Sequence, residues 1–399
     1  MMVLLSLLGL LAGVAGVVGI MQRSALVDGV RHGSGPLAVQ AQQLYRSLSD
    51  ADATAASAFL SNGVEPAALR DRYQSDIAAA SAALAAVTAG ADTDPAAVGQ
   101  LSAQLPVYTG LVDTARTYNR LGKPLGAAYL REASGLMRTQ LLPVAQRLYQ
   151  SETERLRDDR SGGAEFPWLA VPLLLFTIGG LVWAQRYLSR RTHRTFNVGL
   201  LVATGAAIIM LAWIGLSSLV VQDHLDAGRS NGSARVDVLA QARIAALTAR
   251  ADEALTLVAH GSGGDFDKDF DQRMTALAGT GGGGLLGRAG DGSAPTDAQQ
   301  AAQAWRDAHK KLREQDDGGN YKAAVDLAIG GADTSTGTAF NRLDADLAKD
   351  IVAANAVFDR EAGSAANGFT LAAPGLVVLT LLMLAGLVAG FQQRIAEYR

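Results

Sequence analysis

The residue types that most often carry out chemistry are present in this chain, but none is spaced as a catalytic or metal-binding motif. The 399 residues include no cysteine, so disulfides and thiolate metal sites are excluded. The run Gly281–Gly284 lacks the following Gly-Lys-Ser/Thr of a phosphate-binding loop. The five histidines lie without the helical spacing of paired metal ligands, at His32, His193, His224, His260 and His309. We therefore predict a protein that is not an enzyme and that holds no cofactor or metal.

The segment "DFDKDFD" (265–271) places an acidic residue at every second position. A calcium loop needs a glycine and a closing glutamate, and this segment has neither. On a helix this spacing spreads the acidic residues around the cylinder, while Phe266 and Phe270 are typical core residues. We interpret the segment as the solvated start of a helix.

One stretch, "TARTYNRLGKPLGAAYLREASGLM" (114–137), concentrates residue types that are enriched in recognition sites. Arg and Tyr are over-represented in binding hot spots, and Arg can hold a carboxylate with two hydrogen bonds. Gly122 and Pro124 predict a turn between two helices here, and an ordinary solvated turn is the alternative interpretation. The candidate residues for binding an extracytoplasmic partner are Arg116, Tyr118, Asn119, Arg120, Lys123, Tyr129 and Arg131.

Four long runs without a charged residue predict four transmembrane helices, because crossing ~30 Å of hydrocarbon takes about 20 mostly apolar residues. We place these helices at residues 3–21, 167–185, 197–222 and 369–391. The first run could instead be a signal peptide, but it has no basic n-region and no small-residue cleavage site. We therefore expect it to be retained.

The charges between the apolar runs predict the topology, since Lys and Arg accumulate on the cytoplasmic side of short loops. The hairpin 186–196 has four arginines and no acidic residue, and the tail 392–399 is also net basic. Both are predicted to be cytoplasmic in a multi-pass plasma-membrane protein, with segments 22–166 and 223–368 outside. Besides anchoring, the hairpin and tail could bind a cytoplasmic partner through Arg190, Arg191, Arg194, Arg394, Tyr398 and Arg399. They are too short to form a nucleic-acid-binding domain, so no nucleic-acid partner is expected.

Each outer segment is predicted to fold as a four-helix bundle. In the first, apolar residues recur at alternating steps of three and four, as in helices that pack nearly parallel. Its predicted helix breaks lie at 61–66, 88–95 and 121–124, where Gly or Pro occurs. The second segment repeats this plan with weaker signals and a long glycine-rich break at 279–297.

The two halves of the chain also match each other weakly. "DADATAASAFLSNG" resembles "RADEALTLVAHGSGG" about 200 residues later, and a shift of 197 places Tyr108 on Trp305 and Gly122 on Gly319. We therefore predict an all-α integral membrane protein with two tandem extracytoplasmic bundles, built by internal duplication of a span–bundle–span unit.

Several segments, in order along nearly the whole chain, resemble the actinobacterial GlnX-type membrane proteins: "DADATAASAFLSNGVEP", "LRDRYQSDIAAA", "PLGAAYLREASGLM", "ARADEALTLVA", "DDGGNY" and "QRIAEYR". The resemblance implies a four-span protein encoded beside an amino-acid-binding lipoprotein and a cytoplasmic Ser/Thr kinase, protein kinase G. It further implies that the lipoprotein senses aspartate- or glutamate-type amino acids outside and that the membrane protein relays that state inward. The start at Met1-Met2 departs from the basic residues expected before the first span.

We interpret the chain as a non-enzymatic transmembrane signal transducer whose partners are the binding lipoprotein, the kinase and the lipid bilayer. Three alternatives stay open. A direct small-molecule sensor of chemoreceptor-like type would need a polar pocket with converging arginines, an envelope scaffold would show no ligand dependence, and a transporter accessory protein would associate with a permease. A homodimer is left open as well.

Overall fold

The structure, a computed structural model, describes residues 2–61, 64–90, 93–164, 169–192, 197–279, 283–290, 296–369 and 372–396. Every regular element within these residues is a helix, and no strand occurs among them, which confirms the all-α prediction. The chain forms two compact units. We call the first the apolar unit (Met1–Gly33, Leu156–Arg229 and Phe358–Arg399) and the second the bundle unit (Ser34–Arg155 and Ser230–Val357).

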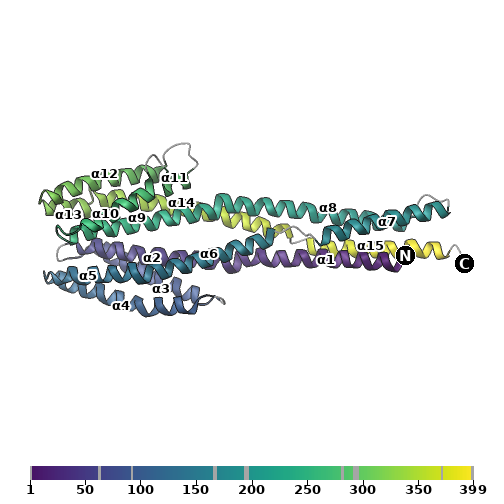
Figure 1. The fold of residues 1–399 in the computed structure, drawn as a ribbon, viewed down its shortest axis with the longest axis horizontal. Coiled ribbons are helices and arrows are strands. Elements are labelled where there is room, and N and C mark those ends of the chain that lie inside the picture. Colours follow the sequence, from purple (N-terminus) through teal and green to yellow (C-terminus); the bar gives the residue numbers. More distant parts are fainter. Residues whose placement is uncertain are drawn as a thin grey trace. The chain divides into compact units, whose positions relative to one another are not determined.

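Four long helices form most of the apolar unit (Figure 1). They are α1 (Met2–Gly29), α7 (Ala170–Thr192), α8 (Val198–Ala227) and α15 (Ala372–Ala396). Helix α1 packs against α7 and α15, and α8 packs against the same two helices, so the four close around a common core. That core is built from fully buried apolar side chains such as Leu174, Leu181 and Met210.

Three helices in the described part of the chain are long and apolar enough to cross a membrane. Their candidate spans are Met2–Leu26, Val198–His224 and Ala372–Gln392. The predicted span 167–185 lies mostly in α7, which is not among them. Arginines at 186, 190 and 191 follow the apolar part of α7 within the same helix and lower its apolar content. The four-span topology therefore stays a prediction.

The candidate span Met2–Leu26 extends beyond the predicted span 3–21 and contains a charged residue. Arg23 lies in Met2–Leu26, is buried, and donates a hydrogen bond from Nη1 to Ser218 Oγ of α8 at 3.3 Å. A charged group inside a span is costly unless it has polar partners. The contact with Ser218 supplies one such partner.

Glycines let α8 and α15 approach closely. A Cβ on Gly199 would lie 2.5 Å from the backbone nitrogen of Gly390 and 2.6 Å from the carbonyl oxygen of Gly386. Gly386 and Gly390 have the four-residue spacing of small residues that membrane helices use for close packing. Asn197 adds a hydrogen bond from Nδ2 to the Gly390 carbonyl at 2.8 Å.

The first half of the bundle unit is a set of helices separated at Gly- or Pro-containing breaks. Its elements are α2 (Gly35–Phe59), α3 (Ala67–Thr88), α4 (Pro95–Arg120), α5 (Leu125–Leu136), the π-helix η2 (Met137–Leu141) and the start of α6 (Leu142–Ala164). The carboxylate of Asp94 caps α4 by accepting from the Ala96 amide at 2.9 Å, and Pro95 occupies the first helical turn, where a missing N–H costs nothing.

The second half repeats this order with more interruptions. Its elements are α9 (Ala234–Val258), α10 (Gly264–Ala278), α11 (Leu285–Ala289), α12 (Asp297–Asp317), α13 (Tyr321–Ile329) and the start of α14 (Thr336–Phe369). The glycine-rich break predicted at 279–297 contains a short helix, α11, because Leu285 and Leu286 are buried. A capping box between Thr296 and Gln299 starts α12.

The same turn closes corresponding helices in both halves. Gly122 and Gly319 have positive φ angles of 62° and 79°, a conformation that glycine adopts more readily than residues with a side chain. The amide of Lys123 donates to the Tyr118 carbonyl at 2.9 Å, and that of Asn320 donates to the Gln315 carbonyl at 2.8 Å. Two π-helical segments also correspond, since η1 (Val30–Ser34) follows α1 and η3 (Gly228–Ser233) follows α8.

Helices α2 and α9 pack against each other at the centre of the bundle unit. α2 also contacts α3, α4 and α5, and α9 also contacts α10, α11 and α13, so both are enclosed on all sides. Every residue from 47 to 58 and from 246 to 258 is buried as a result. Their alanine-rich sequences suit this position, because small side chains allow neighbouring helices to come close.

Candidate functional site

The contact between α2 and α9 buries charged side chains that the surrounding alanines cannot neutralise. Asp50 and Asp52 of α2 and Arg250, Asp252 and Glu253 of α9 are all at most 5% exposed. A buried charge costs several kcal/mol unless it is paired and hydrogen-bonded. We call these five residues and their ion-pair partners the polar seam. It consists of three groups.

The first group joins the two halves of the bundle unit through Arg72 of α3. Its Nη2 lies 2.8 Å from Asp50 of α2 and 3.2 Å from Asp344 of α14. Arg243 of α9 also binds Asp344 through two hydrogen bonds, from Nε at 2.6 Å and from Nη2 at 3.1 Å, one to each carboxylate oxygen. Arg46 lies 3.6 Å from Asp50 and completes the group.

The second group is built around the aspartates two residues further along each central helix. Arg138 of η2 forms an ion pair with Asp252 and lies 3.8 Å from Asp52, so one guanidinium faces a carboxylate from each half. Ser134 donates to Asp52 at 2.8 Å, and Arg273 of α10 donates to Asp252 at 2.9 Å. Both aspartates therefore have more than one partner.

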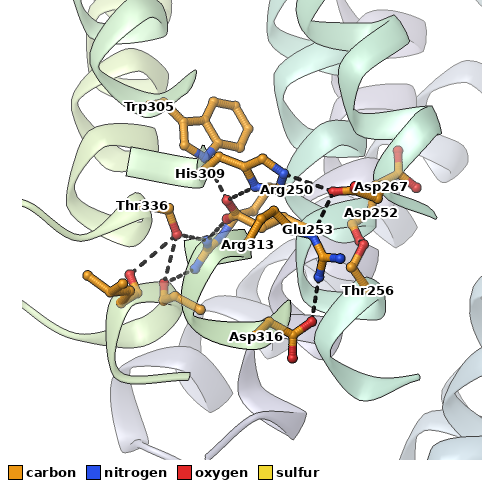
Figure 2. Close-up of polar contacts among 12 residues, drawn as sticks. Arg250, Asp252, Glu253, Thr256, Asp267, Trp305, His309, Arg313, Asp316 and Thr336 are labelled. Carbon is orange, nitrogen blue, oxygen red and sulfur yellow. Dashed lines mark hydrogen bonds and ion pairs between the residues drawn. The ribbon is translucent and has the colours of Figure 1, made fainter. Parts of the chain in front are cut away.

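The third group surrounds Glu253 (Figure 2). This carboxylate forms an ion pair with Arg250 and accepts hydrogen bonds from Trp305 Nε1 at 3.2 Å and His309 Nδ1 at 2.9 Å. The other ring nitrogen of His309 lies 3.1 Å from Asp267.

Aromatic and polar neighbours close this third group. Phe270 stacks on the His309 ring with 3.7 Å between centroids. Arg250 also bonds to the hydroxyl of Thr336 at 3.2 Å and to the carbonyl of Ala328 at 2.7 Å, which ties α9 to the end of α13 and the start of α14.

The geometry makes His309 a buried cation. Both ring nitrogens face carboxylate oxygens, so both carry a proton. Burial is the largest single influence and lowers the pKa of His309. The hydrogen bonds to Asp267 and Glu253 together outweigh it and raise that pKa to about 9. In turn, burial would raise the pKa of Glu253, but His309 and Arg250 hold it below its usual value.

Three buried carboxyl groups of the other two groups have pKa values shifted in the opposite direction. Burial raises the pKa of Asp50, Asp52 and Asp252 more than the neighbouring arginines lower it. Asp76 of α3 is buried near Asp50, and burial together with that second negative charge raises its pKa to about 7. In the polar seam, burial therefore favours the neutral form of these carboxyl groups, and the neighbouring arginines favour the charged form.

This arrangement can join helices and respond to charge. No group of three or more His, Cys, Asp or Glu side chains among the described residues could hold a metal ion. In each of the three groups, at least one cation faces a carboxylate from a different helix. The seam therefore acts as a set of cross-links, and two of its arginines, Arg72 and Arg138, connect one half of the bundle unit to the other.

Of the predicted extracytoplasmic candidates, Arg116 and Asn119 form hydrogen bonds to residues outside α4. Arg116 donates from Nη2 to Glu65 at 3.0 Å and lies 4.1 Å above the ring of Tyr73. Asn119 donates to the carbonyl of Phe59, the last residue of α2, at 2.9 Å. Together they tie the end of α4 to the ends of neighbouring helices.

The other predicted residues of this turn divide into a stacked pair and an exposed group. Tyr118 and Tyr129 stack across α4 and α5 with 5.6 Å between ring centroids and 7° between planes. The exposed side chains, which are free to meet a partner, are Arg120, Lys123 and Arg131.

The cytoplasmic candidates are only partly described. Arg190 is exposed on α7. Arg191 lies in α7 and Arg394 in α15, and for both only the backbone is described. The remaining candidates, Arg194, Tyr398 and Arg399, lie outside the described residues.

The polar seam was not recognised in the sequence, although a signal for it was present. The segments "DADATAASA" and "RADEALTLV" place charged residues inside alanine-rich helices, and they are also the best-matching pieces of the two halves. Asp267 was assigned to a solvated helix start, and this was incomplete, because its carboxylate bonds to the buried His309. The prediction for the two phenylalanines was correct for Phe270, which is fully buried.

The first half of the bundle unit is similar to a known domain family. Residues 26–161 match the model of an actinobacterial sensor domain, from the last residues of α1 through most of α6. No curated protein and no solved structure matched the chain. The sensor-domain match indicates a sensing or signalling role and supports an actinobacterial sensor protein.

Proposed function

We propose that this chain is a non-enzymatic transmembrane signal transducer. It relays extracytoplasmic amino-acid availability, through an amino-acid-binding lipoprotein, to a cytoplasmic Ser/Thr kinase. The observation that carries the proposal is the sensor-domain match over residues 26–161, in a chain with three helices long and apolar enough to cross a membrane. The resemblance to GlnX-type proteins supplies the ligand class and the two partners.

In the proposed layout, α7 is the second of four spans, and both halves of the bundle unit lie outside. The basic hairpin and tail favour this orientation. The matching turns at Gly122 and Gly319, and the π-helices η1 and η3 after α1 and α8, support the internal duplication. A reporter active only in the cytosol should function when fused after Arg191 and fail when fused near Gly90 or Gly284. Activity at either of the last two sites would overturn this topology.

The exposed side chains of the turn between α4 and α5 are the proposed docking point for the lipoprotein. Asn119 connects this turn to the end of α2, and α2 lies on the polar seam. A partner that displaces the turn would therefore act on α2, and the cross-links through Arg72 and Arg138 would pass the displacement to the second half. A coupling of about 1–3 kcal/mol is sufficient to change a partner's affinity from several-fold to about a hundredfold.

The docking step is tested with Arg120→Ala combined with Lys123→Ala. Both side chains are exposed, so the double variant should fold normally and should capture less lipoprotein in a pull-down. The matched control is Arg342→Ala combined with Lys349→Ala, which removes the same two exposed residue types from α14. Equal capture by the test variant, the control and the wild type would move the partner site away from this turn.

The cytoplasmic step is tested separately. Arg190, Arg191 and Arg194 are replaced by Lys, which keeps the anchoring charge but removes the planar guanidinium that pairs with carboxylates. A second variant lacks residues 394–399. If hairpin and tail contact the kinase pathway, amino-acid-dependent phosphorylation of its substrates should fall in cells, while membrane insertion stays normal. Wild-type signalling in both variants would show that these segments are anchors only.

A further inference from the structure

A cavity of about 280 Å³ opens inside the bundle unit beside the first group of the polar seam. One wall comes from α2 and α3, and the other from the segment that joins α13 to α14 and from the start of α14. Gly331 and Asn341, which line it, are exposed, so the cavity is open to solvent.

The cavity lies at a place where the two halves of the bundle unit differ. In the first half, α5 continues through η2 into α6 without a break, and Arg138 of η2 reaches the seam. In the second half, α13 ends at Ile329, α14 begins at Thr336, and the intervening segment begins with Gly330 and Gly331. No comparably large side chain of this segment reaches the seam, and space is left between the two halves.

The lining combines a cation, an anion and hydroxyl groups. Arg72 uses Nε and Nη2 to bind Asp50 and Asp344, while its Nη1 has no hydrogen-bond partner among the described residues. Asp50 supplies a buried acceptor on the same side, and Thr54 and Ser57 add hydroxyls from the next turns of α2. This set can receive a negatively charged group at the guanidinium and a donor group near Asp50.

The ring of Phe340 forms an apolar surface near two guanidinium groups. Arg72 lies 5.9 Å and Arg250 5.7 Å from its centroid, on side chains that also line the cavity. The volume falls just below the ~300–1,000 Å³ of pockets that hold drug-sized molecules. A compact polar solute therefore fits this cavity better than a larger one.

We propose that the cavity binds a compact solute that bears a carboxylate. The carboxylate lies against Arg72, and the remaining polar groups of the solute meet Asp50 and the hydroxyls of α2. This site goes beyond the proposed function, in which the amino acid reaches the chain on a partner protein. A solute held here contacts both halves of the bundle unit at once, so its binding favours one arrangement of the polar seam.

The test uses the purified full chain in lipid nanodiscs, without any partner, and isothermal titration calorimetry. The probes are L-aspartate, L-glutamate and L-glutamine, with succinate as a carboxylate without an ammonium group. Inorganic phosphate and glycerol serve as non-carboxylate controls. We expect saturable binding of at least one carboxylate and none of phosphate or glycerol. Binding of the amino acids alone would further assign the ammonium group to Asp50, whereas binding of succinate would show that carboxylate suffices.

Two variants locate the site. Gly331→Leu places a side chain at the cavity mouth, where a Cβ meets no atom within 4 Å, so the fold should tolerate it and the ligand should bind at least tenfold more weakly. Gly264→Leu is the matched control, since its Cβ also meets no atom within 4 Å but the residue is outside the cavity. Arg72→Lys should likewise weaken binding at least tenfold, because Lys cannot hold two aspartates and a ligand in one plane.

The outcomes separate this site from the relay. No saturable binding of any carboxylate to folded protein, binding of phosphate alone, or full binding by Gly331→Leu would each overturn the cavity proposal. Lipoprotein capture and kinase-substrate phosphorylation are measured on the same variant. If they persist where the cavity proposal has failed, the proposed function stands without it. Carboxylate binding without lipoprotein capture would support the cavity proposal and overturn the proposed relay from the lipoprotein.

Discussion

The buried imidazolium of His309 should make the stability of the bundle unit depend on pH. Its pKa is raised from 6.5 to about 9 by the hydrogen bonds to Asp267 and Glu253, against the effect of burial. Because the folded-state pKa lies above the unfolded one, this contribution is complete below about pH 6.5 and is lost as the pH rises through about 9. Above that pH, Glu253 keeps its ion pair with Arg250 and its hydrogen bond from Trp305, but the imidazole ring of His309 beside it is neutral.

The size of the effect follows from the shift. One pKa unit corresponds to about 1.4 kcal/mol, so the rise from 6.5 to about 9 contributes about 3 kcal/mol to the free energy of unfolding. For a unit of this size, 1 kcal/mol moves the melting temperature by ~2–4 °C. The variant His309→Gln, which cannot carry the charge, should therefore melt about 6–12 °C below wild type at pH 6.

Melting curves of the full chain in nanodiscs between pH 6 and pH 10 measure this difference. The gap between wild type and His309→Gln should narrow as the pH passes 9. His32→Gln is the control, since His32 is exposed and its variant should follow wild type throughout. An NMR titration of ¹⁵N-labelled histidine gives the pKa directly. A pKa of 6.5 or lower, or a gap that stays constant with pH, would refute the buried cation.

Three further substitutions give defined results. Arg138→Met should cost about 3–5 kcal/mol at pH 8, because it leaves the buried Asp52 without a cation and Asp252 with Arg273 alone. Burial already raises the pKa of both, so they should protonate and part of the loss should recover at pH 5, whereas a loss of packing alone would not respond to pH. Gly199→Leu should destabilise the apolar unit, and faster proteolysis in micelles would measure this loss. Gly205→Leu on the same helix is the control, because a Cβ there meets no neighbouring atom. Equal sensitivity of the two variants to proteolysis would contradict the close packing of α8 and α15. Arg116→Ala should lower the melting temperature by several degrees, because it leaves the buried carboxylate of Glu65 unpaired. Arg131→Ala removes an exposed side chain and should change the melting temperature by less than 2 °C. The same shift for both variants would assign Arg116 to the exposed surface.

The helical architecture could be predicted because its signals are local. Gly122 ends α4 in a left-handed turn, and Pro95 and Pro124 stand at or just before the first residue of a helix. Such residues act through their own backbone conformation, which does not depend on distant parts of the chain. The short helix α11 was missed for the opposite reason. Its glycine-rich surroundings predict a loop, and only the burial of Leu285 and Leu286 against other elements keeps it helical.

The polar seam could not be predicted because its residues are brought together by packing. His309 is 56 residues from Glu253 and 42 from Asp267 along the chain, so no sequence motif joins them. Asp52 and Asp252 resemble solvated helix residues, and an alanine-rich helix has no strong apolar stripe to show that it is enclosed on all sides. The sequence contained one clue. The matching segments "DADATAASA" and "RADEALTLV" place charged residues at corresponding positions of the two halves.

The use of charges between α2 and α9 bears on how a displacement could cross the bundle unit. Well-packed apolar residues in place of a buried ion pair are often equally or more stabilising, so stability alone does not require the seam. Arg138 faces Asp52 from one half and Asp252 from the other. A slip by one helical turn, about 5.4 Å, would take it away from one of these carboxylates and leave a buried charge unpaired. The seam therefore disfavours sliding of α2 along α9, and a displacement of one half is passed to the other instead of being lost at their contact. A relay through two packed sets of helices depends on this property, and the pH-dependent loss in Arg138→Met measures how much free energy maintains it.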